Sequence, residues 1–211
     1  DDLIVPDPSD LIGGYGRVYI YYGGQNFDTE KDWFYESKNE WSFYGVEVAC
    51  GDLNNDGYND LVVESANELC NGCVGVPSLF FYKGSADSIS KTPDVFFQGD
   101  TSYKIYRNFN IDNFNSDGKN CLLCSRRTAD GEDDYIMNFK INNDFSELTI
   151  DSILLNNVEV KYSPIIKYGN FNIDSIIDFV VKENPGYQNK KSYFYISPID
   201  YCRPDTIYKF S

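Results

Sequence analysis

The feature that most constrains this chain is a nine-residue segment that occurs three times, each copy directly before a short apolar run. The clearest copy is Asp52–Asp60, which reads DLNNDGYND, and weaker copies are Asn113–Cys121 and Asn170–Asp178. Their first residues stand at positions 52, 113 and 170, so the spacings are 61 and 57 residues. The apolar runs Leu61–Val63 and Phe179–Val181 are rich in β-branched side chains, which predicts strands. A period of this length in a chain of strands is typical of propellers and stacked arrays.

The first copy has the composition of a calcium-binding loop. It places side-chain oxygens at loop positions 1, 3, 5 and 9, and a glycine, Gly57, at position 6. Ca²⁺ takes about six to eight oxygen ligands at about 2.3–2.6 Å, so clustered carboxylates and carboxamides suit it. An EF-hand would need a glutamate at position 12 and a helix after it, but that position is Val63, inside a predicted strand. The segment is therefore predicted to be a calcium loop that joins two β-strands.

Aromatic runs recur with the same period and define the rest of the repeat. One unit reads as a strand, the calcium loop, a second strand, a longer loop, an aromatic strand, a turn and a fourth strand. The predicted aromatic strands are 17–22, 78–82, 134–139 and 192–196, and the candidate fourth strands are 32–37, 93–98, 147–154 and 205–210. Four antiparallel strands per repeat are the content of a propeller blade, so the predicted fold is an all-β propeller.

Several of these residues resemble the FG-GAP repeat of integrin α-subunit propellers and of related bacterial and eukaryotic proteins. Phe43–Gly45 approximates the "FG" element, and Val48–Gly51 leads from it into the loop Asp52–Asp60. The "GAP" element is degenerate, at Glu64–Ala66 and at Val5–Pro8. The resemblance extends over nearly the whole chain. It implies four-stranded antiparallel blades, a bound Ca²⁺ and an extracellular, non-enzymatic interaction module.

Family members bind Ca²⁺ through side chains at loop positions 1, 3, 5 and 9 and a main-chain oxygen at position 7. Carried over to this sequence, the implied ligands are Asp52, Asn54, Asp56, the carbonyl of Tyr58 and Asp60 in the first loop, Asn170, Asn172, Asp174, the carbonyl of Ile176 and Asp178 in the third, and Asn113, Asn115, Asp117 and the carbonyl of Lys119 in the weaker second. Asp2 matches Asp60 and is the last ligand position of a partial site.

The charge of each loop ranks its expected affinity for Ca²⁺. The loop Asp52–Asp60 has three carboxylates and is expected to bind best. The loop Asn170–Asp178 has two, and Ser175 replaces the glycine at a position that prefers positive φ, which costs about 1 kcal/mol. The loop Asn113–Cys121 keeps only Asp117 as a carboxylate, and Cys121 stands where an oxygen is needed. This second loop is predicted to be empty or to be held by asparagine hydrogen bonds.

The repeat also predicts how the chain is organised. Asp2–Val5 matches Asp60–Val63, so the chain is expected to begin inside a blade. The predicted layout is a single propeller segment, with a partial blade at 1–42 and blades at about 43–99, 100–156 and 157–211. Propellers of this family usually have seven blades, so we expect the four visible here to belong to a larger ring. A closed four-bladed propeller is the alternative.

Composition excludes several classes of function. The formal charge is −15 and the pI is about 4.3, which argues against nucleic acid or an anionic membrane as a partner. No apolar run approaches the length of a membrane span. The chain has no histidine, which removes histidine-based triads and the usual acid–base residue. Because motifs for nucleophilic or phosphoryl chemistry are also missing, the protein is predicted not to be an enzyme.

The six cysteines fit a disulfide-bonded extracellular protein better than a zinc protein. Cys70–Cys73 and Cys121–Cys124 imitate paired zinc-binding CxxC motifs. However, Cys121 and Cys124 have an odd offset on a predicted strand, so they should point to opposite faces. A Cys70–Cys73 disulfide would close a tight loop, and pairing among the other four cysteines stays open. Those four are Cys50, Cys121, Cys124 and Cys202.

Three functional hypotheses follow. The first is a secreted or cell-surface adhesion module whose propeller binds a protein or glycan ligand, as the resemblance implies. The second is an architectural subunit that self-assembles by adding a strand to the open edge of the incomplete blade at residues 1–37. The third is a catalytic or accessory propeller domain of a carbohydrate-active enzyme. Sugar-binding aromatic residues on an exposed loop would favour the third hypothesis, and Trp33 and Trp41 are the only tryptophans.

Overall fold

The computed structural model shows only β-strands as regular elements in the residues that it describes, so the all-β prediction is confirmed. Those residues are 2–8, 14–24, 28–68, 75–99, 103–114, 117–128, 134–154, 165–169, 178–182, 192–195 and 208–210. None of them forms a helix that is long and apolar enough to cross a membrane.

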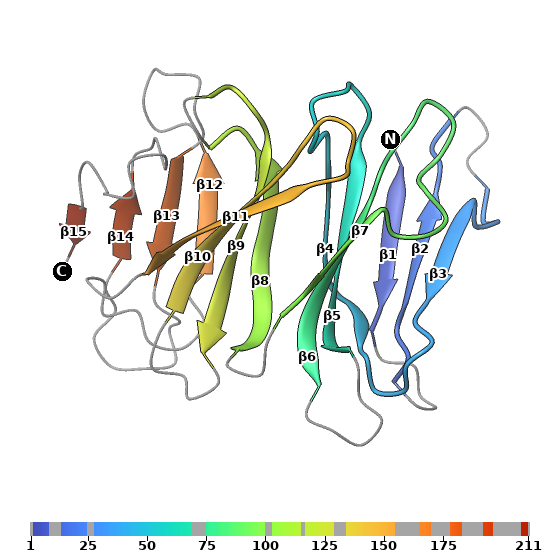
Figure 1. Cartoon of the computed structure of the whole chain (residues 1–211), viewed down its shortest axis with the longest axis horizontal. Helices are drawn as coiled ribbons and strands as arrows, with labels where there is room; N and C mark the ends of the chain where they lie inside the picture. Colours follow the sequence, from blue (N-terminus) through green and yellow to red (C-terminus); the bar gives the residue numbers. More distant parts are fainter. Residues whose placement is uncertain are drawn as a thin grey trace. The chain divides into compact units, whose positions relative to one another are not determined.

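Within the described residues the strands form four sheets, and in each sheet neighbouring strands follow the order of the chain (Figure 1). Every strand pair whose register is defined is antiparallel, as expected for strands joined by short connections. The first sheet has three strands and the others have four. The strands are β1 (Leu3–Asp7), β2 (Arg17–Tyr21) and β3 (Trp33–Glu36); β4 (Tyr44–Gly51), β5 (Asp60–Glu68), β6 (Val76–Tyr82) and β7 (Val95–Gln98); β8 (Tyr103–Asp112), β9 (Cys121–Thr128), β10 (Asp134–Ile141) and β11 (Leu148–Leu154); β12 (Ile165–Gly169), β13 (Asp178–Lys182), β14 (Ser192–Tyr195) and β15 (Tyr208–Phe210).

The predicted order of strands within the repeat is confirmed. Strands β5, β9 and β13 follow the three predicted loops. Strands β2, β6, β10 and β14 are the predicted aromatic strands, and β3, β7, β11 and β15 are the predicted fourth strands. The predicted strand types were correct because apolar and aromatic runs are short here and are separated by Gly, Asn and Asp.

The first two sheets share the contact that begins their last strand. Lys83 N donates to Asp94 Oδ2 (2.8 Å), and Asp94 directly precedes β7. Tyr22 N donates to Asp32 Oδ2 (2.5 Å), and Asp32 directly precedes β3. Phe81 pairs with Val95, the first residue of β7, and Lys83 lies two residues after Phe81. In the same way, Ile20 pairs with Trp33, the first residue of β3, and Tyr22 lies two residues after Ile20. The two sheets therefore share the same turn before their last strand, including the aspartate that accepts the hydrogen bond.

The chain divides into two compact units. The first consists of Asp1–Cys50 and Tyr58–Lys104, and the second of Gly51–Gly57 and Ile105–Ser211. Apart from residues at the junctions, the first unit holds the sheets β1–β3 and β4–β7, and the second holds β8–β11 and β12–β15. The loop Asp52–Asp60 is itself divided, because its residues up to Gly57 belong to the second unit.

The core of the first unit lies between its two sheets. Trp33 and Tyr82 pack edge to face with ring centroids 5.4 Å apart, and Tyr44 meets Phe80 in the same way at 5.2 Å. The Tyr44 and Tyr82 hydroxyls form a buried hydrogen bond of 2.6 Å, which satisfies both polar groups. The aromatic residues of these strands therefore serve packing. The core residues are Val18, Ile20, Trp33, Tyr44, Leu61, Val63, Phe80, Tyr82 and Ile89.

The second unit has a comparable apolar interior. The rings of Tyr106 on β8 and Phe139 on β10 pack edge to face at 6.0 Å. Tyr168 on β12 packs against Phe114 at 5.4 Å, and its hydroxyl donates to Asn108 O (2.6 Å). Tyr168 therefore joins the sheet β12–β15 to the sheet β8–β11.

The described cysteines do not form a zinc site. Strand β9 pairs with β10 in unbroken register from Leu122 to Arg127, so Cys121 and Cys124 lie on opposite faces as expected. Both are fully buried, whereas Cys50 is exposed, and no disulfide joins any two of these three described cysteines. Cys70, Cys73 and Cys202 lie outside the described residues, so the predicted disulfides stay predictions.

Candidate metal centre

The loop Asp52–Asp60 connects β4 to β5, and its first half closes around one carboxylate. Asp56 N donates to Asp52 Oδ1 and Gly57 N donates to Asp52 Oδ2, each over 2.9 Å. Gly57 has a φ of 91°, which confirms that loop position 6 needs a residue that tolerates positive φ. Asn55 also has positive φ, at 59°, a conformation that asparagine tolerates. The turn therefore has the tight shape that its sequence predicts.

Three of the predicted ligands converge in this half of the loop. Asn54 is 2% exposed; its Oδ1 accepts a hydrogen bond from Asp56 N (3.2 Å), and its Nδ2 donates to Asp56 Oδ2 (2.9 Å). Asp52 and Asn54 thus accept from the same backbone amide, that of Asp56, and Asn54 also bonds to the Asp56 carboxylate. Carboxylate and carboxamide oxygens are the donors that Ca²⁺ prefers, so the residues fit the ion. When bound, Ca²⁺ would neutralise these carboxylates; Asp52, Asn54 and Asp56 would hold it.

Neighbouring residues of the second unit hold this half of the loop in place. Asn120 Nδ2 donates to Asp52 O (2.6 Å), and Asn120 N donates to Asn55 Oδ1 (3.0 Å). Asn54 Nδ2 also donates to Asn143 O (3.1 Å). Gly51 packs so closely on Ile111 that a Cβ would lie 2.9 Å from the isoleucine Cγ2. The loop is therefore anchored by the protein as well as by its own hydrogen bonds.

The remaining ligands predicted for this loop, Tyr58 and Asp60, belong to the first unit. Asp60 is fully buried at the start of β5, and its Oδ1 accepts a hydrogen bond from Gly84 N (2.8 Å). Tyr58 is 44% exposed. Among the described residues, no three Asp, Glu, Cys or His side chains gather closely enough to hold a metal ion by themselves. An ion in this loop would therefore also need carboxamide and main-chain oxygens.

Asp2 repeats the contact of Asp60. Gly23 N donates to Asp2 Oδ1 (2.7 Å). Gly23 lies two residues after Tyr21, which pairs with Leu3 of β1, and Gly84 lies two residues after Tyr82, which pairs with Leu61 of β5. The predicted match between Asp2–Val5 and Asp60–Val63 is thus confirmed in the sheets. In both repeats this aspartate ties the start of one strand to the turn after the aromatic strand.

In the second predicted loop, Asn113–Cys121, the one carboxylate is bonded to nearby lysine residues of the protein. Asp117 Oδ1 accepts a hydrogen bond from Lys119 N (3.0 Å), and Lys140 Nζ forms an ion pair with Asp117 Oδ2 (3.0 Å). Partial burial raises the pKa of Asp117, but these hydrogen bonds and the two lysine charges together hold it below its ordinary value. Gly118 has a φ of 71° and so matches Gly57. Lys140, for which no local pattern in the sequence predicts a role, therefore pairs with the one carboxylate predicted as a ligand here.

The remaining predicted ligands, and Cys121, which occupies a ligand position without an oxygen, are distributed as follows. Cys121 is buried, and its Sγ lies 3.8 Å from Asp112 O. Asp178 is buried at the start of β13, opposite Gly169. Asn113 is half-buried, and Lys119 is exposed. Asn115, Asn170, Asn172, Asp174 and Ile176 lie outside the described residues.

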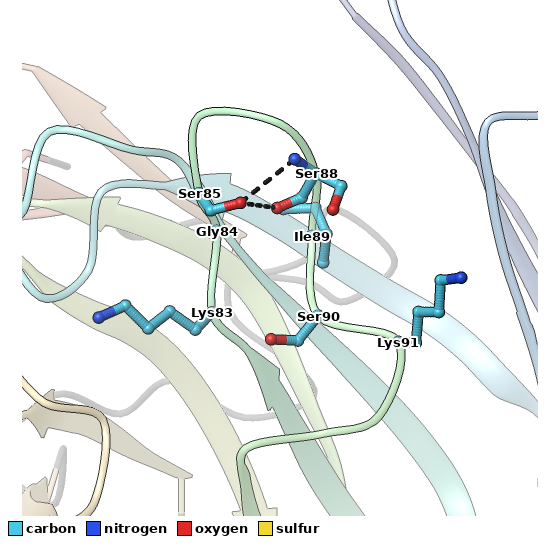
Figure 2. A pocket seen from close by; sticks show the side chains of 7 residues that line it. All are labelled: Lys83, Gly84, Ser85, Ser88, Ile89, Ser90 and Lys91. Atoms are coloured by element: carbon cyan, nitrogen blue, oxygen red, sulfur yellow. Dashed lines mark hydrogen bonds between the residues drawn. The ribbon is translucent and has the colours of Figure 1, made fainter.

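A shallow pocket beside Asp60 was not predicted. Its volume is about 290 Å³, and the turn between β6 and β7 lines it, from Lys83 to Lys91. Figure 2 shows the Ser85 hydroxyl bonded to Ser88 and the two lysine side chains extending in different directions. The amides of Gly84, Ser85 and Ser90 are already bonded to Asp60, Ser88 O and Lys83 O. Because these donors serve the turn, we assign the pocket no ligand.

Comparison with known proteins leaves the family open: neither a protein-family model nor a curated protein sequence matches this chain.

Proposed function

We propose that this protein is part of an extracellular, calcium-stabilised propeller of the FG-GAP type, which binds a protein or glycan ligand and catalyses no reaction. The observation that carries this proposal is the loop Asp52–Asp60, where hydrogen bonds bring the side chains of Asp52, Asn54 and Asp56 together: Asp52 and Asn54 accept from the Asp56 amide, and Asn54 donates to the Asp56 carboxylate. The recurrence of that loop before β9, with Gly118 at the position of Gly57, supports the repeat.

The sheets also support the proposal. Three sheets have four strands in chain order, which is the construction of a propeller blade. The shared contacts of Asp2 with Asp60, and of Asp32 with Asp94, are what a tandem array of one structural unit produces. In this proposal the four sheets are four blades, the first of them partial, within a larger ring.

The role of Ca²⁺ is tested by thermal unfolding of the chain with and without a chelator. Near saturation, at about one hundred times the dissociation constant, binding contributes about 2.7 kcal/mol, which raises Tm by roughly 5–10 °C for a chain of this size. Asp56→Asn removes one ligand charge at almost constant shape, so it should reduce this shift. Asp117→Asn is the matched control, because Asp117 is paired with Lys140, and it should leave the shift unchanged. An unchanged Tm on chelation of the wild-type protein would show that the calcium assignment is wrong.

The architectural alternative has one observation in its favour. In the described residues β1 is an edge strand, whereas the equivalent strand β5 pairs with β4. An open edge is a template for strand addition. Pro6 lies within β1, however, and it has no N–H to donate to an added strand. Light scattering after size-exclusion chromatography separates the alternatives: a concentration-dependent assembly, enhanced by Pro6→Val, supports strand addition, and a monomer at all concentrations opposes it.

A further inference from the structure

The two tryptophans of this chain lie in opposite environments. Trp33 on β3 is 5% exposed, and its Nε1 donates to Ser90 O (3.0 Å), so it belongs to the core of the first unit. Trp41 is 57% exposed, in the connection between β3 and β4. An indole left in water gives up the stabilisation that burial would provide.

The backbone of this connection is strained at both of its aromatic residues. Trp41 has a φ of 63° and Phe43 a φ of 51°. Bulky L-residues rarely adopt this left-handed region, and such residues persist only where the surrounding structure enforces them. Strain of this kind clusters at binding sites, where it holds a side chain ready for its ligand.

Hydrogen bonds to two other segments, at Gly14 and on β5, enforce this conformation. Phe43 N donates to Gly14 O (2.9 Å), and Asn67 Nδ2 donates to Trp41 O (3.0 Å). Ser42 O accepts from both Asn67 N (3.0 Å) and Ser65 Oγ (2.8 Å). The backbone that carries the exposed indole is therefore held in one conformation. Little backbone conformational entropy would be lost when a ligand binds to the indole.

The surroundings of the indole combine one apolar neighbour with polar groups. The Phe43 ring lies beside Trp41, with centroids 6.4 Å apart and planes inclined by 54°. On the same connection, Glu40 and Lys38 are exposed, and Glu40 accepts a hydrogen bond from the Tyr15 hydroxyl (3.0 Å). The connection therefore offers an aromatic face for C–H groups, and its sequence places a carboxylate and an ammonium within one and three residues of the indole.

We propose that Trp41 and Phe43 form the stacking platform of a binding site for a neutral glycan. A pyranose ring has an apolar C–H face that stacks on an indole and a rim of hydroxyls that bonds to carboxylates and ammonium groups. A protein hot spot would instead set the tryptophan among further apolar contacts that exclude water. The formal charge of −15 disfavours polyanionic glycans, which leaves uncharged sugars. The inference rests on the proposed function as a binding module and specifies its ligand class.

Tryptophan fluorescence tests this site directly. Trp33→Phe makes Trp41 the only tryptophan of the chain, so its emission reports on the platform alone. The probes are hexamers of β-1,4-glucan, β-1,4-mannan, β-1,4-galactan and chitin. We expect at least one of them to shift the emission of Trp41 to shorter wavelength and to protect it from acrylamide quenching.

Calorimetry with the responding hexamer then separates binding from folding. Trp41→Gly removes the ring and suits the positive φ, so thermal stability should be kept or raised while the affinity falls by at least about tenfold. Phe96→Ala is the matched control, because Phe96 is 45% exposed on the regular strand β7, and it should leave the affinity unchanged.

Two results would overturn the inference: no hexamer alters the emission of Trp41, or Trp41→Gly binds the responding hexamer as tightly as the wild type does. A protein partner that needs Trp41 while every hexamer fails would also overturn it. Each of these results leaves the calcium-dependent Tm shift untouched, so failure of the glycan site is distinguishable from failure of the proposed function.

Discussion

Gly57→Ala is the substitution that tests the loop geometry most directly. Gly57 has a φ of 91°, and a Cβ at this position would meet no atom within 4 Å, so the change acts on the backbone alone. A left-handed conformation costs an L-residue about 1–2 kcal/mol. Alanine restricts the unfolded chain and returns about 0.4–1 kcal/mol of that. The expected net loss is roughly 0.5–1 kcal/mol in the free energy of unfolding.

Urea unfolding followed by circular dichroism measures this loss, and a thermal scan should show Tm lowered by roughly 1–4 °C. Gly24→Ala is the matched control. A Cβ at Gly24 would also meet no atom within 4 Å, but Gly24 does not have a left-handed φ. Its replacement should leave stability unchanged or raise it by about 0.4–1 kcal/mol.

Gly118→Ala extends the test to the second loop, because Gly118 has a φ of 71° and equally open space. We expect the same sign and size of effect as at Gly57. If Gly57→Ala were as harmless as Gly24→Ala, the argument that loop position 6 requires positive φ would be refuted.

Two further predictions concern pH. Burial, with smaller contributions from Tyr35 and Glu68, raises the pKa of both Tyr44 and Tyr82 above the ordinary value near 10, although the hydrogen bond with Tyr44 partly offsets the rise at Tyr82. Above pH 10 the unfolded state therefore binds fewer protons than the folded state, and stability should fall as the pH rises. Urea unfolding from pH 8 to 11 checks this, and Tyr44→Phe with Tyr82→Phe should flatten the slope, whereas an unchanged slope would contradict the assignment. The pKa of Asp117 lies below its ordinary value, because the Lys119 amide and Lys140 outweigh the effect of burial. The contribution of Asp117 to the stability of the fold is therefore complete above the pKa of the unfolded state, and it is lost as the pH falls through the pKa of the folded state. Lys140→Met should raise the pKa of Asp117 in an NMR titration; a constant pKa would show that the ion pair has no effect.

The strands were predictable from the sequence because their signals are local. An apolar run such as Leu61–Val63, which follows a cluster of Asp, Asn and Gly, can hardly form anything but a strand after a turn. The predicted role of Gly57 also held, since only its own backbone decides it. The fourth strands at 33–36 and 95–98 were recognised from the repeat. They are short, and their aspartate contacts were not foreseen.

The contacts that decide the candidate sites were not predictable. Lys140 pairs with Asp117, which is 23 residues away in the sequence, and Asn120 donates to Asp52, which is 68 residues away. No local sequence pattern can predict contacts between residues so far apart. The division of the loop between two units, after Gly57, is likewise a matter of packing. Both tryptophans looked equivalent in the sequence, yet one is core and the other is exposed.

The sequence by itself determined the all-β class, the period of the repeat and the turns that need positive φ, because each depends on residues within a few positions of one another. Only the tertiary structure decided that Asp2 and Asp60 serve equivalent turns, that Lys140 neutralises Asp117, and that Trp41 rather than Trp33 faces solvent. The reason is physical: burial and pairing depend on which strands lie next to each other, and that arrangement arises from the packing of the whole sheet.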